Sequence, residues 1–356
     1  MLGYLRFVFA LLVILDHLGG MAGGVKSFLH WGVFAVFGFY LMSGFLITRI
    51  LHQNYSFEFR AFALNRFLRI FPVYYLVALV SAAVLLVEPS AGAFHEAWRV
   101  RLHASDVVGN ILVFPFEFYG APFRLVPPAW SVAVELVNYF LLWLVVARSR
   151  RLALATVLLS IGYHLTSLAL GTEWHTHYFP WYAALLPFSL GTLFYFFKDA
   201  VAALPATAVR WGATVASIAW NGNLVACGIA SGPGEPYFEL FFYVNLLALF
   251  VLIGCLTSPS LSSALRRSGK FAGDLAYPMF LVHWIVGFGV SLIFFGGRHK
   301  GLLLVGLTIP PVIVISILLC WLGNRWIEPL RNGVRATAGL LARRAITAPS
   351  AVHSAR

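Results

Sequence analysis

Long apolar segments separated by short polar ones recur along most of the chain. A membrane-spanning α-helix needs about 20 mostly apolar residues to cross a hydrocarbon core of about 30 Å. Segments of about this length cover residues 4–23, 30–50, 71–87, 129–147, 152–170, 177–197, 209–230, 236–256, 271–295 and 301–322. The pattern therefore predicts an all-α, polytopic membrane protein with about ten transmembrane helices.

Two connecting segments differ from the short loops. Residues 56–70 place apolar and basic side chains on opposite faces at helical spacing, which predicts an amphipathic helix on the membrane surface that ends at Pro72. In the long connection 88–128, the apolar segment 106–116 is too short to span, so we expect a re-entrant or interfacial piece over the site.

We expect one transmembrane domain over residues 1–335, because neither a repeat of fixed period nor a soluble domain is evident in the sequence. Residues 336–356 are rich in arginine and alanine. They predict a short, basic, disordered cytoplasmic tail.

Composition and charge support a membrane protein and orient it. Hydrophobic residues make up 60% of the chain and charged residues only 11%, against about 25% charged residues in soluble domains. The net charge is +12, but the basic residues lie in short clusters between apolar segments, which disfavours nucleic acid as a partner. By the positive-inside rule these connections and both termini are cytoplasmic. The main clusters are Arg49, Arg60, Arg66, Arg69, Arg148, Arg150, Arg151, Arg266, Arg267 and Lys270.

The first apolar segment carries three ionisable side chains, Arg6, Asp16 and His17. At about 100° per residue, Arg6 and His17 share one helix face, about 16 Å apart along the axis. An ionisable residue within a membrane helix costs about 3 kcal/mol on insertion scales and usually faces the bundle interior or a wet cavity. We therefore interpret Arg6 and His17 as site residues and Asp16 as their partner. The alternatives are a topology charge at Arg6 and a packed histidine at His17.

Two further ionisable groups lie at a similar depth in other predicted helices. At about 1.5 Å per residue, His17 and His283 are each about 18 Å from the cytoplasmic ends of their segments, and Glu135 is about 21 Å from its own. We expect these three side chains to converge. Arg66 and Arg69, one helical turn apart at the cytoplasmic end, suit the phosphates of a nucleotide-like donor or of anionic lipid.

Other polar residues have competing interpretations. Ser43 precedes Gly44, and the pair favours close helix packing over an acyl-carrying serine. Trp130 is either an interface anchor or a platform for a sugar. The histidines around His177 are expected in a solvated external loop, and no metal site is expected.

The chain resembles the acyltransferase-3 family of integral-membrane O-acyltransferases. The resemblance rests on segments that follow the family's order, namely the Arg6 and His17 pair, 32–48, 65–75, 128–135, 276–283 and 326–331. It implies about ten spans with cytoplasmic ends, an acyl-CoA donor, a catalytic histidine, and an arginine pair of RxxR spacing that corresponds here to Arg66 and Arg69. One departure is the sequence Phe-Ala-Val at 34–36, where the family often has an acidic residue.

We therefore expect a bacterial inner-membrane enzyme that transfers an acyl group, preferably acetyl from acetyl-CoA, to a hydroxyl of a cell-envelope saccharide or lipid-linked glycan. The expected roles are catalysis by His17, Arg6 and Asp16, donor binding by Arg66, Arg69, Ser43 and Tyr74, and acceptor binding by Glu135, Trp130 and His283. Membrane lipids are expected partners. Direct transfer and an acyl-enzyme route remain open, and a transporter with Arg6 and His17 as coupling charges is the alternative function. A membrane scaffold without chemistry is a third possibility.

Overall fold

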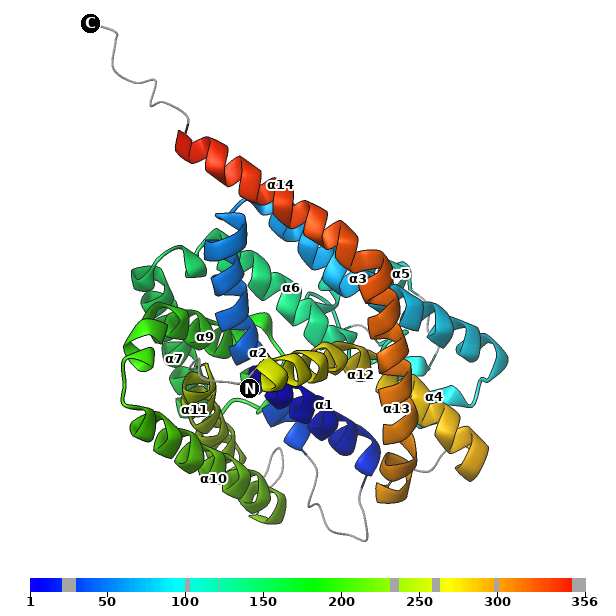
Figure 1. The fold of residues 1–356 in the computed structure, drawn as a ribbon. Coiled ribbons are helices and arrows are strands. Elements are labelled where there is room, and N and C mark those ends of the chain that lie inside the picture. The colour runs from blue at the N-terminus through cyan, green and yellow to red at the C-terminus, as the bar shows by residue number, and fades with distance from the viewer. Residues whose placement is uncertain are drawn as a thin grey trace, which may run out of the picture.

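The computed structural model describes residues 1–20, 30–99, 103–120, 122–230, 237–257, 263–297 and 301–347, with side chains as far as residue 338. Within these ranges the chain is a bundle of helices without strands (Figure 1). The longer helices are α1 (Leu2–Gly19), α2 (Trp31–Ile50), α3 (Phe59–Val87), α6 (Ala129–Leu144), α7 (Arg150–Ala169), α9 (Trp181–Ala202), α10 (Ala206–Ala230), α11 (Phe238–Leu256), α12 (Ser263–Phe295), α13 (Leu302–Leu322) and α14 (Glu328–Thr347). Short elements connect them: η1 (Leu51–Tyr55), α4 (Ala91–Phe94), η2 (Glu96–Trp98), α5 (Ala104–Leu112), η3 (Phe114–Glu117), η4 (Val146–Arg148), α8 (His175–Tyr178) and η5 (Gly323–Ile327).

The predicted fold class is confirmed. Among the described residues, 9 helices are long and apolar enough to cross a membrane, and α6 is a shorter apolar helix of 16 residues. Each of the apolar segments predicted from the sequence coincides with one of these helices. The protein is an all-α, multi-pass membrane protein.

Helix α2 occupies the middle of the bundle and is held by close backbone contacts. A Cβ atom at Gly44 would lie 2.1 Å from the Phe188 carbonyl oxygen of α9, so only glycine fits this crossing. The hydroxyls of Thr48 and Thr192 hydrogen-bond across the same pair of helices at 2.9 Å. This confirms the close approach expected at Gly44 and fixes the direction in which the neighbouring Ser43 points.

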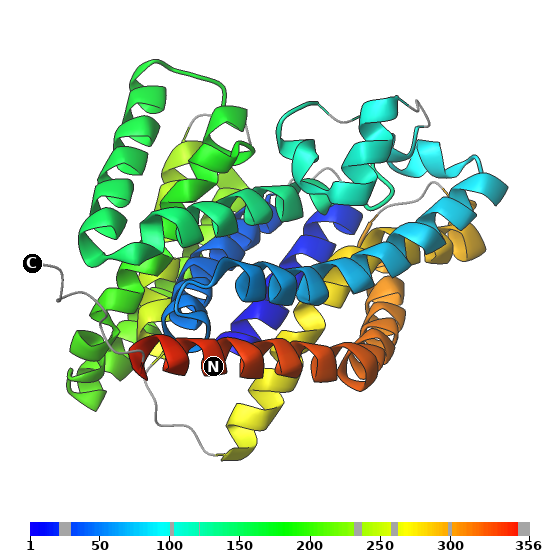
Figure 2. The same ribbon diagram turned by 90° about the horizontal axis from the view of Figure 1, so that it is seen from above.

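Helices α1 and α12 meet in the same manner where both begin. A Cβ atom at Gly3 would lie 1.8 Å from the Gly269 carbonyl oxygen. We call this side of the bundle, where α1, α3 and α12 begin and α2 ends, the N-terminal face. Figure 2 shows α14 running across it. Asn65 of α3 bonds α14 directly, because its side-chain Nδ2 donates to the Arg331 carbonyl oxygen at 3.2 Å.

The prediction that a surface helix ends at Pro72 is wrong. Helix α3 runs without interruption from Phe59 to Val87 and contains Pro72 in its interior. A proline removes one backbone donor, which membrane helices tolerate when neighbouring groups satisfy the freed acceptors. The carbonyl that loses its helical donor is that of Leu68, four residues before Pro72. Helix α12 anchors this part of α3, because its Tyr277 hydroxyl donates to the Ile70 carbonyl oxygen at 2.9 Å. Arg66 and Arg69 therefore belong to a spanning helix rather than to a separate surface helix.

The apolar segment 106–116 does not cross the bundle, as its length predicted. It forms the 9-residue helix α5 and the short turn η3 on the side opposite the N-terminal face. The Tyr74 hydroxyl of α3 donates to the Asn110 carbonyl oxygen at 2.9 Å, and the Asn110 side chain accepts from the Leu125 backbone N–H at 2.8 Å. The first bond attaches the segment to the outer half of α3, and the second joins it to the end of the same connection at Leu125.

The prediction of a disordered tail over 336–356 is wrong as far as Thr347, because α14 extends to that residue. Alanine, leucine and arginine are strong helix formers and continue the helix that begins at Glu328. Residues 348–356 of the predicted tail lie outside the described residues.

Candidate functional site

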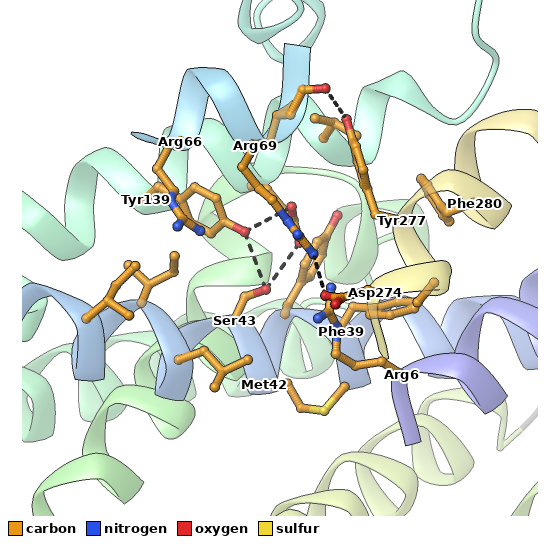
Figure 3. Close-up of a pocket in the computed structure, with 18 of the residues that line it drawn as sticks. Arg6, Phe39, Met42, Ser43, Arg66, Arg69, Tyr139, Asp274, Tyr277 and Phe280 are labelled. Carbon is orange, nitrogen blue, oxygen red and sulfur yellow. Dashed lines mark hydrogen bonds and ion pairs between the residues drawn. The ribbon is translucent and has the colours of Figure 1, made fainter. Parts of the chain in front are cut away.

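A cavity of about 380 Å³ lies between α1, α2, α3, α6, α12 and α14 (Figure 3). Its charged lining residues are Arg6, Arg66, Arg69, Glu135, Lys270, Asp274, Glu328, Arg331 and Arg335. Basic side chains outnumber acidic ones in this list. The cavity is therefore suited to an anionic molecule that enters from the N-terminal face.

The basic end of the cavity is built by three helices. Arg69 of α3 forms an ion pair with Asp274 of α12 at 3.6 Å. The Asp274 carboxylate also accepts from Lys270 at 3.2 Å. Arg66 Nη2 donates to the Asn65 side chain at 3.2 Å, whereas the buried Arg66 Nε has no hydrogen-bond partner among the described residues. A buried donor without a partner is costly. Arg66 thus retains capacity to bind an anion that enters the cavity.

The same end is closed by α14. Glu328 accepts from Arg331 and, at 2.9 Å, from Arg335. Arg331 also donates to the Asn65 side-chain oxygen, with its Nη2 at 3.3 Å. Asn65 therefore connects the arginines of α3 with those of α14.

The deeper part of the cavity holds a carboxylate with two hydroxyl groups. Ser43 Oγ of α2 donates to Glu135 Oε1 at 3.3 Å, and the Tyr139 hydroxyl donates to Glu135 Oε2 at 3.1 Å (Figure 3). Tyr139 lies one helical turn after Glu135 on α6, which brings both side chains to the same face. Arg6 reaches the same cavity from α1 and contributes a positive charge to its lining.

Two histidines from distant parts of the sequence form a pair beyond this cavity. His17 Nδ1 lies 2.8 Å from His283 Nε2, and His283 Nδ1 lies 2.8 Å from the Phe280 carbonyl oxygen. The Trp284 ring stacks on His17 with the ring centroids 5.3 Å apart. Neither histidine is among the described residues that line the cavity, but Phe280 lines it and precedes His283 by one helical turn. The cavity therefore ends close to the histidine pair.

A protein-family model described as an acyltransferase domain matches residues 2–325. The chain belongs to the acyltransferase-3 family. Searches of curated proteins and of solved structures find no match. The match covers every described helix that lines the cavity except α14. Together with the spanning helices, it shows that this protein is a multi-pass membrane acyltransferase.

The structure brings together most of the site residues expected for this acyltransferase, but in two groups. Arg6, Ser43, Arg66, Arg69 and Glu135 line one cavity. His17, His283 and Glu135 were expected to converge. His283 does contact His17, whereas Glu135 contacts Ser43 and Tyr139 in the cavity. Helical depth alone did not distinguish the two groups because it gives no rotation about the helix axis.

Three of the expected site residues have contacts of another kind. Asp16 Oδ1 accepts from the His30 backbone N–H at 2.6 Å and so orders the start of α2. Tyr74 is bonded to Asn110 of the loop, and it does not line the cavity within the described residues. Trp130 packs on Phe179, with ring centroids 4.7 Å apart.

Several residues of the acyltransferase cavity were not predicted. Tyr139, Lys270, Asp274 and Arg331 all line it. A weak signal was present for some of them, because Tyr139 follows Glu135 by one turn and Lys270 precedes Asp274 by one turn. Arg331 ends a segment that carried the family resemblance, but its contact with Asn65 depends on how α14 folds back over α3.

The expectation of a solvated loop around His177 is wrong for that residue, which is buried. The Tyr243 hydroxyl of α11 lies 2.8 Å from His177 Nδ1 and also 2.8 Å from His164 Nδ1 of α7. Burial lowers the pKa of His177. Helices α7 and α11 cover this loop, which a pattern confined to the loop does not reveal. Among the described residues there is no group of three or more His, Cys, Asp or Glu side chains suited to a metal ion.

Proposed function

We propose that this acyltransferase transfers an acyl group, acetyl in the first instance, from acetyl-CoA to a hydroxyl of a cell-envelope saccharide or lipid-linked glycan at a bacterial inner membrane. The observation that carries the proposal is a cavity with a basic end on the N-terminal face and a histidine pair beyond its other end. A long donor with phosphates at one end and a thioester at the other matches this arrangement.

The arginines provide the donor-binding end. Guanidinium groups bind phosphate through charge-assisted hydrogen bonds, and the unpartnered Nε of Arg66 supports such a role. By the positive-inside rule the N-terminal face is cytoplasmic, which is where coenzyme A is available. Arg6, further along the cavity, contacts the donor rather than the acceptor in this proposal.

The chemistry requires a base near the thioester. His17 takes the proton of the acceptor hydroxyl, whose oxygen attacks the thioester carbonyl carbon. The carbon–sulfur bond then breaks, and the proton passes from His17 to the sulfur, so that coenzyme A leaves as a thiol. Neutral histidine is suited to this exchange because its reference pKa is about 6.5.

A second route within the same function is an acyl-Ser43 intermediate. It is favoured by one observation, the hydrogen bond of Ser43 Oγ to the Glu135 carboxylate inside the cavity. The transport alternative is not favoured, because the chain belongs to an acyltransferase family.

The test is release of coenzyme A from acetyl-CoA by the purified protein in lipid nanodiscs with envelope saccharides as acceptor. We expect His17→Ala to lower kcat by about 10²-fold or more, as for loss of a general base. His175→Ala is the matched control, because His175 begins the short helix α8 and its side chain is 62% exposed. Arg66→Ala combined with Arg69→Ala is expected to raise the donor KM.

Unchanged kcat in His17→Ala would contradict the assignment of the base. Absence of turnover in the wild-type protein with acetyl-CoA, but activity with a longer acyl-CoA, would overturn the acetyl assignment alone.

A further inference from the structure

The histidine pair is anchored at a backbone carbonyl of α12. His283 is fully buried, and its Nδ1 lies 2.8 Å from the Phe280 carbonyl oxygen. A carbonyl oxygen only accepts hydrogen bonds, so His283 Nδ1 carries the hydrogen atom. A second proton on Nε2 would place a cation at a fully buried position whose bonded neighbours are a carbonyl and another imidazole, and such burial is costly. His283 is therefore neutral with its lone pair on Nε2.

This arrangement determines the tautomer of His17. The Nε2 lone pair of His283 faces His17 Nδ1 at 2.8 Å, so His17 Nδ1 must be the donor. A neutral His17 then has its own lone pair on Nε2. The Trp284 ring, stacked on His17 at an interplanar angle of 30°, helps to fix the plane in which that lone pair lies.

We propose that His283 is a positioning residue that holds His17 in the Nδ1–H tautomer and so makes Nε2 the nitrogen that accepts the hydroxyl proton. The inference rests on the proposed acyl transfer. In the reaction, Nε2 takes the proton while the acceptor oxygen bonds to the thioester carbon, and the same proton moves to the sulfur when the carbon–sulfur bond breaks. The bond from His17 Nδ1–H to His283 persists throughout and stabilises the transient imidazolium, as an acceptor on the far side of a catalytic histidine does in other enzymes.

This role differs from the acceptor binding expected for His283. A residue that donates to a backbone carbonyl through one nitrogen and accepts from His17 through the other has no ring nitrogen left for a saccharide. Among the described residues, ionisable groups near the pair include Asp16, which accepts from the His30 backbone, and His95, whose ring contacts Trp284 with the centroids 4.1 Å apart. His283 bonds directly to His17 Nδ1, whereas these contacts of Asp16 and His95 are with other groups.

Two amide variants separate the two hydrogen bonds of His283. In His283→Gln the side-chain oxygen reaches the position of Nε2 and accepts from His17. In His283→Asn the shorter amide bonds the Phe280 carbonyl but does not reach His17. We expect His283→Gln to retain kcat within about 10-fold and His283→Asn to lower it by about 10²-fold, the range typical of a misdirected general base. The donor KM should be unchanged in both, because His283 does not line the cavity among the described residues.

The tautomer itself is measured by ¹⁵N NMR on histidine-labelled protein in nanodiscs, with His17→Ala used to assign the signals. Protonation of His17 on Nδ1 in the wild type and in His283→Gln, with a mixture of tautomers in His283→Asn, would support the inference. A wild-type His17 protonated on Nε2, or a His283→Asn variant with wild-type kcat, would overturn it. This measurement needs no turnover, so it decides the role of His283 even where the assays with acetyl-CoA fail and overturn the proposed function.

Discussion

At the scale of single residues, the cavity contains a serine hydroxyl in contact with a carboxylate. Ser43 and Tyr139 both donate to Glu135, one hydroxyl to each carboxylate oxygen. This arrangement satisfies a carboxylate within a membrane protein, where an unpaired one is costly. It also resembles a serine with an adjacent base. The geometry alone therefore fits both a polar contact between α2 and α6 and an acyl-carrying serine.

The variant Ser43→Ala distinguishes these roles. We expect it to retain kcat within about threefold, because His17 is the proposed base and an interhelical polar contact in a membrane protein contributes only about 0.6 kcal/mol. Wild-type protein incubated with radiolabelled acetyl-CoA and no acceptor should then carry no stable label. Label that survives denaturation in the wild type and disappears in Ser43→Ala would establish the acyl-Ser43 route instead.

At the scale of elements, the loop 88–128 is joined to the bundle at the start of α9. Glu117 Oε1 accepts from the Trp181 backbone N–H at 2.6 Å. Trp181 is the first residue of α9, whose early N–H groups have no partner within the helix. Burial raises the pKa of Glu117 from 4.5 to about 7, and the bond from Trp181 lowers it by a smaller amount. This side chain is a proton-sensitive link between the loop and the helix.

The raised pKa predicts a pH-dependent stability. A carboxyl whose pKa is higher in the folded than in the unfolded state binds its proton more tightly when folded, so unfolding becomes easier as pH rises. The loss in Tm attributable to Glu117 should occur between about pH 4.5, its ordinary pKa, and about pH 7, its raised pKa in the folded protein. Thermal unfolding from pH 4.5 to 8 should show a smaller decline in Glu117→Gln, whose amide oxygen still accepts from Trp181. Identical declines in the two proteins would contradict the prediction.

At the scale of the whole molecule, the distribution of charge gives the bundle a direction. The basic end of the cavity, the start of α12 and the helix α14 all lie on the N-terminal face. The described part of the loop 88–128 lies on the opposite side of the bundle, where Glu88, Glu96, Asp106 and Glu117 outnumber Arg99 and Arg124. The proposed reaction therefore takes its donor from one side of the membrane, whereas the acceptor approaches the histidine pair from the other.

Cysteine labelling tests this orientation. After replacement of the native cysteines by alanine, single cysteines are introduced as Lys270→Cys on the N-terminal face and His175→Cys on the opposite side, where the side chains are 79% and 62% exposed. In intact cells a membrane-impermeant maleimide should label only the His175→Cys protein, because the N-terminal face is expected to be cytoplasmic. Both proteins should react after permeabilisation. Labelling of Lys270→Cys in intact cells would reverse the assigned orientation.

The sequence by itself determined the helices of this protein, because a stretch of about 20 apolar residues has few alternatives to a helix in a membrane. It also singled out Arg6 and His17, since charge within an apolar segment is visible without a structure, and Arg66 and Arg69, which lie one helical turn apart. Its errors were local ones. Pro72 indicated an end to α3, but a membrane helix tolerates a proline inside a packed bundle, and α3 continues to Val87.

Only the tertiary structure decided which polar residues meet. His17 and His283 are 266 residues apart, as are Asn65 and Arg331. The depth of a residue along its helix follows from counting residues, and this placed Glu135 level with the two histidines. The direction of a side chain depends on how each helix is rotated and tilted against its neighbours, which close contacts such as the one at Gly44 determine. That is why Glu135 faces the cavity with Ser43, while His283 reaches across to His17.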